Sequence, residues 1–227
     1  MEQLANYKLV KLLVTRMLFG FIVLACVFFL TAGTFQYWHA WTLLGVFFIP
    51  WIFVAAYLVN KNPALLQRRM KMKEQMRSQK RYVIFAMPIY FLIYIIPGFD
   101  YRFHWSTVPF IVVIIADILV FLGYMIIFFV FRENTYASRI VTVEEDQNVI
   151  SSGPYALVRH PMYVGVMLMF VFSPLALGSF WALIPALIIP VVLVLRIHDE
   201  ENLLKEDLPG YQEYMQKVKY RLLPGVW

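Results

Sequence analysis

Two long apolar runs near the start of the chain decide its fold. They are MLFGFIVLACVFFLTAGTF at residues 17–35 and WTLLGVFFIPWIFVAAYLV at residues 41–59. A helix needs about 20 apolar residues to cross the hydrocarbon core of a bilayer, and each run is close to that length. Because a second span follows the first after a short turn, the first run is not a cleaved signal peptide. The two runs predict a membrane-spanning helical hairpin.

The composition of the whole chain agrees with a membrane protein. Of its 227 residues, 61% are hydrophobic and only 15% are charged. One soluble core could not bury that much apolar side chain. Two further apolar runs extend the pattern, at residues 83–97 and 107–131. The first of these is short and contains Pro88, which predicts a kink, whereas the second is long enough to cross the bilayer with tilt.

The remaining apolar segment, residues 161–195, is interrupted by Pro174 and Gly178 and predicts a hairpin of two short helices. The tail, residues 196–227, is expected to form an amphipathic helix on the membrane surface, interrupted at Pro209. The prediction is therefore an all-α polytopic membrane bundle with four spans, a C-terminal helical hairpin and a cytoplasmic amphipathic tail helix. We expect residues 1–131, the four-span bundle, and residues 132–227, the connector, hairpin and tail, to form one integrated unit.

The distribution of basic residues predicts the orientation of the spans. The net charge is +6, and the loop between residues 60 and 82 is rich in lysine and arginine, whereas the two opposite loops contain only Arg102. Basic loops stay on the cytoplasmic side, so both termini are expected there, with the basic loop touching anionic lipid. Nucleic acid is an unsuitable partner because the basic residues adjoin membrane segments and lack interleaved aromatic residues.

Polar residues that could carry chemistry are concentrated in the C-terminal part of the chain. In ALVRHPMYVG, residues 156–165, Pro161 suits the first turn of a helix, which places His160 at the helix entrance. The unpaired N–H groups of a helix start favour a carboxylate or a phosphate. The alternative, a purely structural cap at the membrane interface, stays open.

A second polar group follows the apolar hairpin in RIHDEENLL, residues 196–204. Arg196 and Glu200 are four residues apart and project from one face of a helix. Glu200 could take the ammonium of an amino-acid-like ligand, and the planar fork of Arg196 could hold a carboxylate. A surface salt bridge between the two is the alternative. The acids around His198 lack the spacing of a metal site, so we expect no metal.

Three other polar residues and several absent motifs limit the choice of function. Asp117 lies within an apolar run and is either functional or a buried, hydrogen-bonded acid, while His39 and His104 in the outer loops are not expected to act. No GxGxxG, GxxxxGK[ST] or GxSxG motif occurs, so a Rossmann-type cofactor site is not expected. Cys26 is the only cysteine in the chain, which excludes an intrachain disulfide.

Three motifs in order resemble one known family. The segments VISSGPYALVRHPMYVG (149–165), RIHDEENLL (196–204) and PGYQEYMQKVKYRLLPG (209–225) resemble the isoprenylcysteine carboxyl methyltransferase family and its phospholipid methyltransferase relatives, in their prokaryotic form. The resemblance implies a multi-pass protein of the prokaryotic cytoplasmic membrane with a cytoplasmic active site. It also implies S-adenosylmethionine as a cofactor that is bound without a Rossmann domain.

The resemblance further implies roles for individual residues. Glu200 would bind the cofactor's ammonium, and Arg196 would orient the methyl acceptor and act with Tyr163 in catalysis. The methionine part would be enclosed by His160, Pro161, Met162 and Tyr163, and the adenosine side by Gln147, Asn148, Val149, Ile150 and Tyr155. This connector, EEDQNVI at residues 144–150, lacks the histidine of the eukaryotic pattern.

The acceptor is expected to be an apolar or lipid-linked molecule that enters from the bilayer and presents a carboxylate. Transfer from a sulfonium to a carboxylate or thiolate needs only positioning and removal of water. An amine would also need a base, for which His160, Tyr163 or Glu201 are the nearby candidates. A phospholipid amine or a small thiol is therefore an alternative acceptor. An NADPH-dependent sterol-type reductase is less favoured because the sequence lacks basic residues for contacts with the 2′-phosphate of NADPH. A transporter is less favoured because the sequence shows no internal symmetry.

Overall fold

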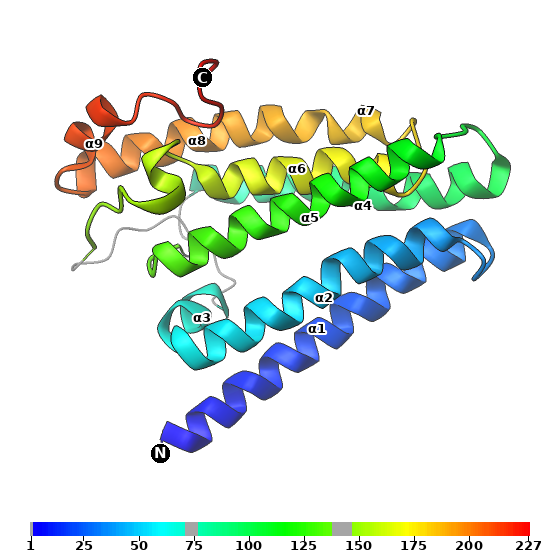
Figure 1. Ribbon diagram of the computed structural model, residues 1–227, viewed down its shortest axis with the longest axis horizontal. Helices are drawn as coiled ribbons and strands as arrows, with labels where there is room; N and C mark the ends of the chain where they lie inside the picture. The colour runs from blue at the N-terminus through cyan, green and yellow to red at the C-terminus, as the bar shows by residue number, and fades with distance from the viewer. Residues whose placement is uncertain (1, 71–76, 138–146) are drawn as a thin grey trace.

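The computed structural model describes residues 2–70, 77–137 and 147–227 of the chain (Figure 1). Its four long helices are α1 (Glu2–Ala32), α2 (Trp38–Lys61), α4 (Arg77–Phe103) and α5 (Phe110–Glu133). Each contains a segment long and apolar enough to cross a membrane, namely Leu9–Ala32, Trp38–Lys61, Ile84–Phe103 and Phe110–Glu133. The described residues contain no strand, and the predicted all-helical membrane bundle is confirmed.

The C-terminal half forms the predicted apolar hairpin. Its arms are α6 (Pro161–Ala176) and α8 (Ile188–Asp207), joined by a turn that contains the short helix α7 (Leu183–Ala186). Gly178 in this turn has a φ of +74°, a conformation that favours glycine. Helix α6 packs mainly along α5, and α8 packs along α4. The hairpin is therefore part of the bundle rather than a separate layer.

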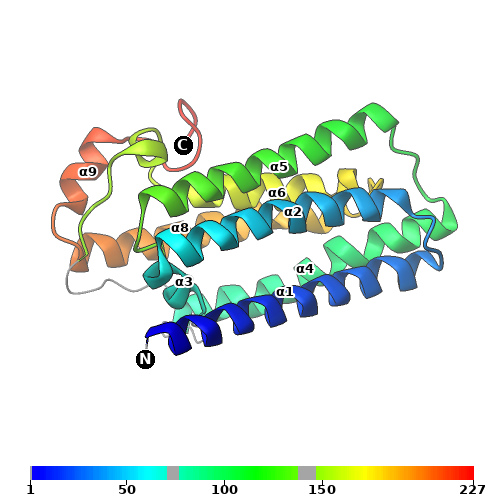
Figure 2. The same ribbon diagram turned by 60° about the horizontal axis from the view of Figure 1, so that its bottom comes forward.

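Three short helices complete the chain: α3 (Pro63–Met70), the 3₁₀ helix η1 (Gly153–Ala156) and α9 (Tyr211–Lys217). Both termini, α3 and α9 lie at one end of the bundle, which we call the inner end, and the α1–α2 and α4–α5 connections lie at the other, the outer end (Figures 1 and 2). This placement agrees with the predicted topology, although which side faces the cytoplasm remains a prediction. The middle of the basic loop (71–76) and of the connector (138–146) lies outside the described residues.

The predicted third span was too short. Helix α4 continues through both Pro88 and Pro97 to Phe103, so the loop expected after Pro97 is largely helical. A proline removes one backbone hydrogen bond, but packing can hold the helix on either side of it. Here Gly98 lies so close to α1 that an added Cβ would be 1.7 Å from Thr31 Oγ1. This close helix–helix contact explains why the proline does not end the span.

The predicted break in the tail is confirmed, but the expected helix after it is mostly wrong. Helix α8 ends at Asp207, Gly210 has a φ of +82°, and α9 ends at Lys217. The last ten residues are not helical and fold back toward α6, where Arg159 N donates to Tyr220 O and His160 N to Arg221 O, both at 2.9 Å. Backbone pairing with the connector thus replaces the last part of the expected helix.

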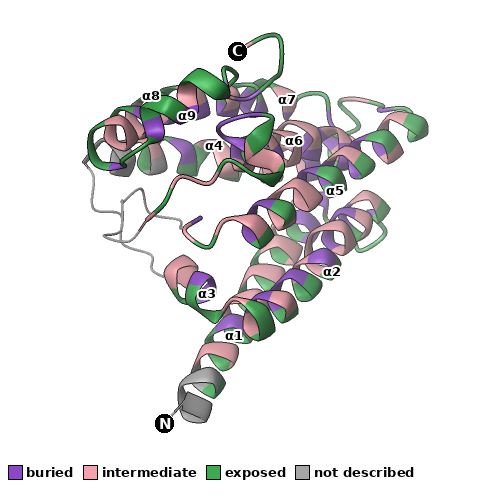
Figure 3. Ribbon diagram, turned by 60° about the vertical axis from the view of Figure 1, so that its left-hand side comes forward, coloured by how far each residue is buried: buried purple, intermediate pink, exposed green. Residues whose placement is uncertain are grey.

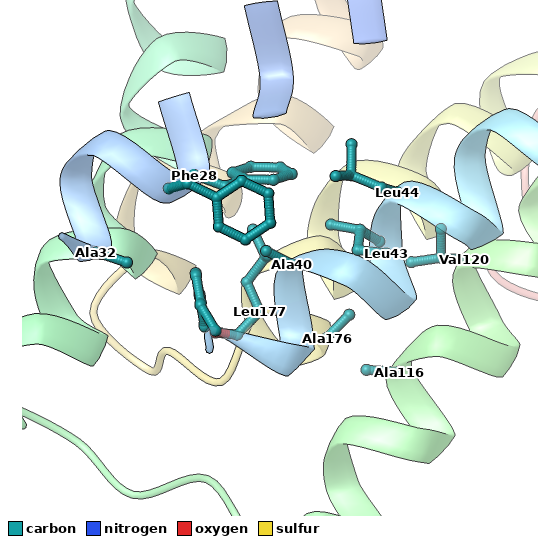
Figure 4. Packing of buried hydrophobic residues seen from close by; sticks show 11 residues of the cluster. Phe28, Ala32, Ala40, Leu43, Leu44, Ala116, Val120, Ala176 and Leu177 are labelled. Atoms are coloured by element: carbon teal, nitrogen blue, oxygen red, sulfur yellow. The ribbon is translucent and has the colours of Figure 1, made fainter. Parts of the chain in front are cut away.

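The main apolar core lies between α1, α2, α5 and α6. Phe28, Leu43, Val120 and Ala176 turn toward one another from these four helices (Figure 4). Many positions on the outer faces of the helices are exposed (Figure 3). Large apolar residues are among the exposed residues, such as Phe19 at 69% exposure. A surface this apolar is suited to contact with lipid tails.

Two glycines bring α5 and α6 unusually close. An added Cβ on Gly123 would be 2.6 Å from Gly165 O, and one on Gly165 would be 2.6 Å from Gly123 O. Small residues are typical of tight helix contacts in membranes, where close packing drives association. Because Gly165 follows the start of α6 by about one turn, this contact fixes that start against α5.

At the outer end, a buried carboxylate joins three segments. Asp100 on α4 is fully buried and accepts hydrogen bonds from Ser106 N at 2.8 Å, Ser106 Oγ at 2.6 Å and Ser179 Oγ at 2.5 Å. Nothing in the sequence pattern marks Asp100 for this role. Asp117 is also buried and stays without an assigned role.

Candidate active site

The candidate site begins where the connector enters α6. His160 is the residue that caps the helix, and Pro161 is its first residue, as the sequence predicted. Proline suits this position because its missing N–H has no partner in the first turn of a helix. The side chain of His160 is 4% exposed. The helix start therefore holds a buried imidazole rather than an exposed one.

Three side chains converge on Glu201 of α8. Arg159 Nε donates to Glu201 Oε1 at 2.7 Å, and Arg221 Nε donates to Glu201 Oε2 at 2.9 Å. His160 Nε2 lies 3.2 Å from Glu201 Oε1. Glu201 itself is fully buried. These contacts, which we call the Glu201 cluster, join the connector, α8 and the C-terminal tail.

The electrostatics of the cluster keep Glu201 ionised. Burial alone would raise the pKa of Glu201, but hydrogen bonds from His160, Arg159 and Arg221 outweigh burial and hold the pKa well below its ordinary value. Arg159 Nη1 also donates to Val218 O and to Lys219 O, each at 2.8 Å. A buried charge needs such complete pairing, since a lone one is very costly.

One turn into the bundle, Tyr163 connects α6 to α8. Tyr163 Oη donates to Glu200 Oε2 at 2.5 Å, and the guanidinium carbon of Arg196 lies 5.9 Å from the centre of the Tyr163 ring. Burial, followed by the nearby charge of Glu200, raises the pKa of Tyr163 well above its ordinary value. Tyr163 therefore stays protonated and acts as a donor. Arg196 and Glu200, predicted to share one helix face, both reach this tyrosine.

The connector packs beside α9 and the end of α8. Val149 belongs to an apolar cluster with Leu208, Tyr211 and Tyr214, and an added Cβ on Gly210 would be 3.9 Å from Val149 Cγ2. Gln147 and Ile150 are half-buried, and Asn148 is exposed. The expected adenosine-side residues 147–150 thus lie next to the tail helix.

Tyr155 joins this connector to the rest of the site. Its hydroxyl accepts a hydrogen bond from Asn134 Nδ2 at 2.9 Å, and its carbonyl accepts one from Tyr214 Oη at 2.7 Å. Burial raises the pKa of Tyr155 to about 12, with the Asn134 hydrogen bond opposing and Glu200 adding to the rise. The charge of Glu200, one of the predicted cofactor ligands, is therefore close enough to affect the pKa of Tyr155.

The structure brings together most of the predicted residues and adds others. Tyr155, His160, Tyr163, Arg196 and Glu200 lie near the start of α6 and along the second half of α8. The partners that hold them, for which the sequence predicted no role, are Arg159, Arg221, Asn134 and Tyr214. One sequence signal pointed to the cluster, because Arg159 and Glu201 directly adjoin the predicted His160 and Glu200.

Chemically, the site offers a carboxylate, a guanidinium, two phenols and a helix start. This set can hold a ligand that carries both a positive and a negative group. Among the residues the structure describes, no group of three His, Cys, Asp or Glu side chains is arranged to hold a metal ion.

Comparison with known families matches the region that contains the site. Residues 111–208 match the family model described as phospholipid methyltransferase. The match includes α5, the connector, α6 and α8, and therefore both the Tyr163–Glu200 pair and Glu201. Arg221, in the tail, lies outside it. No curated protein compared with the chain matches it.

Proposed function

From the match of residues 111–208 to the phospholipid methyltransferase family model, we propose that the protein transfers a methyl group from S-adenosylmethionine to an apolar or lipid-linked acceptor. The acceptor group is a carboxylate. The observation that carries the proposal is the meeting of α6 and α8, in which Tyr163 contacts Glu200 and His160 contacts Glu201.

The residues at this meeting point fit the cofactor's chemistry. Glu200 can pair with the cofactor's ammonium, and the ring of Tyr163 can face its sulfonium, since aromatic faces attract cations. His160, Pro161 and Met162 enclose the methionine part, and residues 147–150 line the adenosine side. The bound cofactor would supply a methyl group on a sulfonium, which a nucleophile takes by in-line displacement.

Two of the three nearby candidates for a base are poorly suited to an amine acceptor. An amine must lose a proton before or during methyl transfer. Tyr163 is a protonated donor and Glu201 has a lowered pKa and paired oxygens, which leaves His160, in contact with Glu201, as the remaining candidate. A carboxylate arrives deprotonated, and Arg196 can orient it. Desolvation then favours the reaction because charge is neutralised in the transition state.

The exposed apolar faces of the bundle support entry of the acceptor from the bilayer, and the placement of both termini at the inner end supports a cytoplasmic site. The match to a phospholipid methyltransferase family favours a second acceptor, the amine of a phospholipid. Incubation of the purified protein with lipid extract and methyl-labelled cofactor separates the two. A base-labile labelled product indicates an ester, and a base-stable one indicates an amine or a thioether.

Calorimetric titration of the detergent-purified protein with S-adenosylmethionine and with NADPH tests the cofactor. We expect saturable binding of S-adenosylmethionine and none of NADPH. Saturable binding of NADPH without binding of S-adenosylmethionine would contradict the proposed methyltransferase activity and indicate a reductase. In the same preparation, Arg196→Ala should lower turnover while the Kd for S-adenosylmethionine stays unchanged.

A further inference from the structure

The short helix α3 does not lie free on the lipid surface as its basic sequence suggested. Leu65 and Leu66 are buried and pack in one cluster with Leu58 of α2 and with Val130 and Phe131 of α5. Met70, at the end of α3, accepts a hydrogen bond from Arg16 Nη1 at its carbonyl at 3.1 Å. Helix α3 is therefore docked on the inner ends of the spans.

This docking directs Arg69 toward the candidate site. Arg69 Nη1 donates to Ala137 O at 2.9 Å, and its guanidinium carbon lies 4.2 Å from the centre of the Phe131 ring. The same nitrogen is 3.9 Å from Met162 Sδ, in the first turn of α6. The carbonyl and the ring fix the guanidinium beside a residue expected to enclose the cofactor.

The neighbouring arginine has a different environment. Arg68 Nη1 donates to Thr135 O at 2.7 Å, and its guanidinium carbon lies 5.0 Å from the centre of the Tyr136 ring. Both contacts are with the segment that follows α5. Two adjacent arginines on one helix thus differ in that Arg69 contacts α6, whereas the described contacts of Arg68 are on the connector.

Opposite charges consequently flank the first turn of α6. Met162 contacts the guanidinium of Arg69, and the next residue, Tyr163, contacts the carboxylate of Glu200. The charges of Arg69 and Glu200 are both close enough to affect the pKa of the Tyr155 phenol. A ligand enclosed by these three residues has a cation on one side and an anion on the other.

The amino-acid end of S-adenosylmethionine carries an ammonium and a carboxylate on the same carbon, which matches this pair of charges. Resting on the proposed function, we propose that Arg69 of the N-terminal bundle binds the cofactor's carboxylate while Glu200 binds its ammonium. A guanidinium has five N–H donors in a planar fork that fits a carboxylate. The four-span bundle would then contribute directly to the cofactor site.

Decarboxylated S-adenosylmethionine, which keeps the ammonium and sulfonium but lacks the carboxylate, tests this assignment. Both ligands are titrated calorimetrically into the full-length, detergent-purified protein and into Arg69→Met. The wild type should bind S-adenosylmethionine at least about 10-fold more tightly than the decarboxylated ligand, as expected for one charge-assisted hydrogen-bonded pair. Arg69→Met should lose that preference, with its affinity for the decarboxylated ligand unchanged.

Two further variants separate binding from folding. Arg68→Met, the matched control on the same helix, should keep the wild-type preference, and Arg69→Lys should retain part of it. An equal loss of affinity for both ligands in Arg69→Met would show a structural role and overturn the assignment, as would an unchanged preference. If the wild type binds S-adenosylmethionine but shows no preference over the decarboxylated ligand, Arg69 is excluded while the proposed function stands. If the wild type binds neither ligand, both proposals fail.

Discussion

In the described part of the chain, each end of the bundle has one fully buried carboxylate, and the two are paired in different ways. At the outer end, Asp100 accepts hydrogen bonds from two serine hydroxyls and a backbone N–H. At the inner end, Glu201 is paired with two arginines and His160. Hydroxyl and backbone donors join loops without compensating the charge of the acid. Cationic partners compensate it and place charged residues around the entrance to α6.

This difference supports the inner end of the bundle as the place of the proposed chemistry. The Glu201 cluster adjoins the Tyr163–Glu200 pair, and that pair lies within the region that matches the phospholipid methyltransferase family model. The Asp100 site adjoins the turns at the opposite end, where its partners connect the α4–α5 loop to the α6–α7 turn. The comparison therefore predicts that changes at Glu201 affect stability and cofactor binding together, and that changes at Asp100 affect stability alone.

The largest expected effect is at Glu201. Glu201→Ala leaves Arg159, His160 and Arg221 without their shared acceptor, and loss of one partner from a buried ion pair costs about 3–5 kcal/mol of unfolding free energy. Denaturation of the protein in detergent measures the loss of unfolding free energy. Glu206→Ala, a substitution of an exposed glutamate on the same helix, is the control. A loss no greater than that of Glu206→Ala would show that the cluster contributes little.

The adjacent Glu200 should separate binding from stability. Glu200→Ala removes the expected partner of the cofactor's ammonium but leaves the Glu201 cluster intact. We expect affinity for S-adenosylmethionine to fall about 10- to 100-fold, the range for one charge-assisted hydrogen bond. The unfolding free energy should fall less than in Glu201→Ala, by about 1–3 kcal/mol, because only Tyr163 Oη loses its acceptor. Calorimetric titration measures the affinity. Unchanged affinity would remove Glu200 from the site.

At the outer end, Asp100→Ala should lower the unfolding free energy by about 1–3 kcal/mol, because Ser106 and Ser179 lose their common acceptor. Cofactor affinity should stay at the wild-type value, since Asp100 is remote from α6's first turn. Thermal unfolding and calorimetry on the same sample measure the two quantities. If Asp100→Ala lowers both the affinity for the cofactor and the unfolding free energy, the two ends do not differ in the way proposed.

The smallest expected effect is a dependence of stability on pH. The pKa of Glu201 is lower in the folded chain than its ordinary value of 4.5, so its contribution to stability is complete above that pH and is lost as the pH falls below it. The difference in melting temperature between the wild type and Glu201→Gln should therefore be constant near neutral pH and shrink below about pH 4.5. A difference that grows on acidification has the wrong sign for this explanation.

The sequence predicts those parts of the fold that depend on local pattern. Apolar run length gives the four spans, Pro161 gives the start of α6, and the spacing of Arg196 and Glu200 gives their shared face. The length of α4 could not be predicted in this way, because Pro97 locally favours an end and only the contact of Gly98 with α1 overrides it.

The charged partners could not be predicted because they are far apart in the sequence. Arg159 and Glu201 are separated by 42 positions, and Glu201 and Arg221 by 20. Helical spacing relates residues three or four apart and says nothing about pairs at these separations. The sequence of the basic loop around Arg69 predicts contact with anionic lipid. Local sequence does not show that α3 docks on α5.

Photo-crosslinking tests most directly whether α6 and α8 form a single cofactor site. The purified protein is irradiated with methyl-labelled S-adenosylmethionine, and the labelled peptides are identified. We predict saturable labelling of peptides from residues 147–165 and from residues 196–208, and none from the turns at the outer end. Labelling confined to the outer end, or the absence of saturable labelling, would contradict the account.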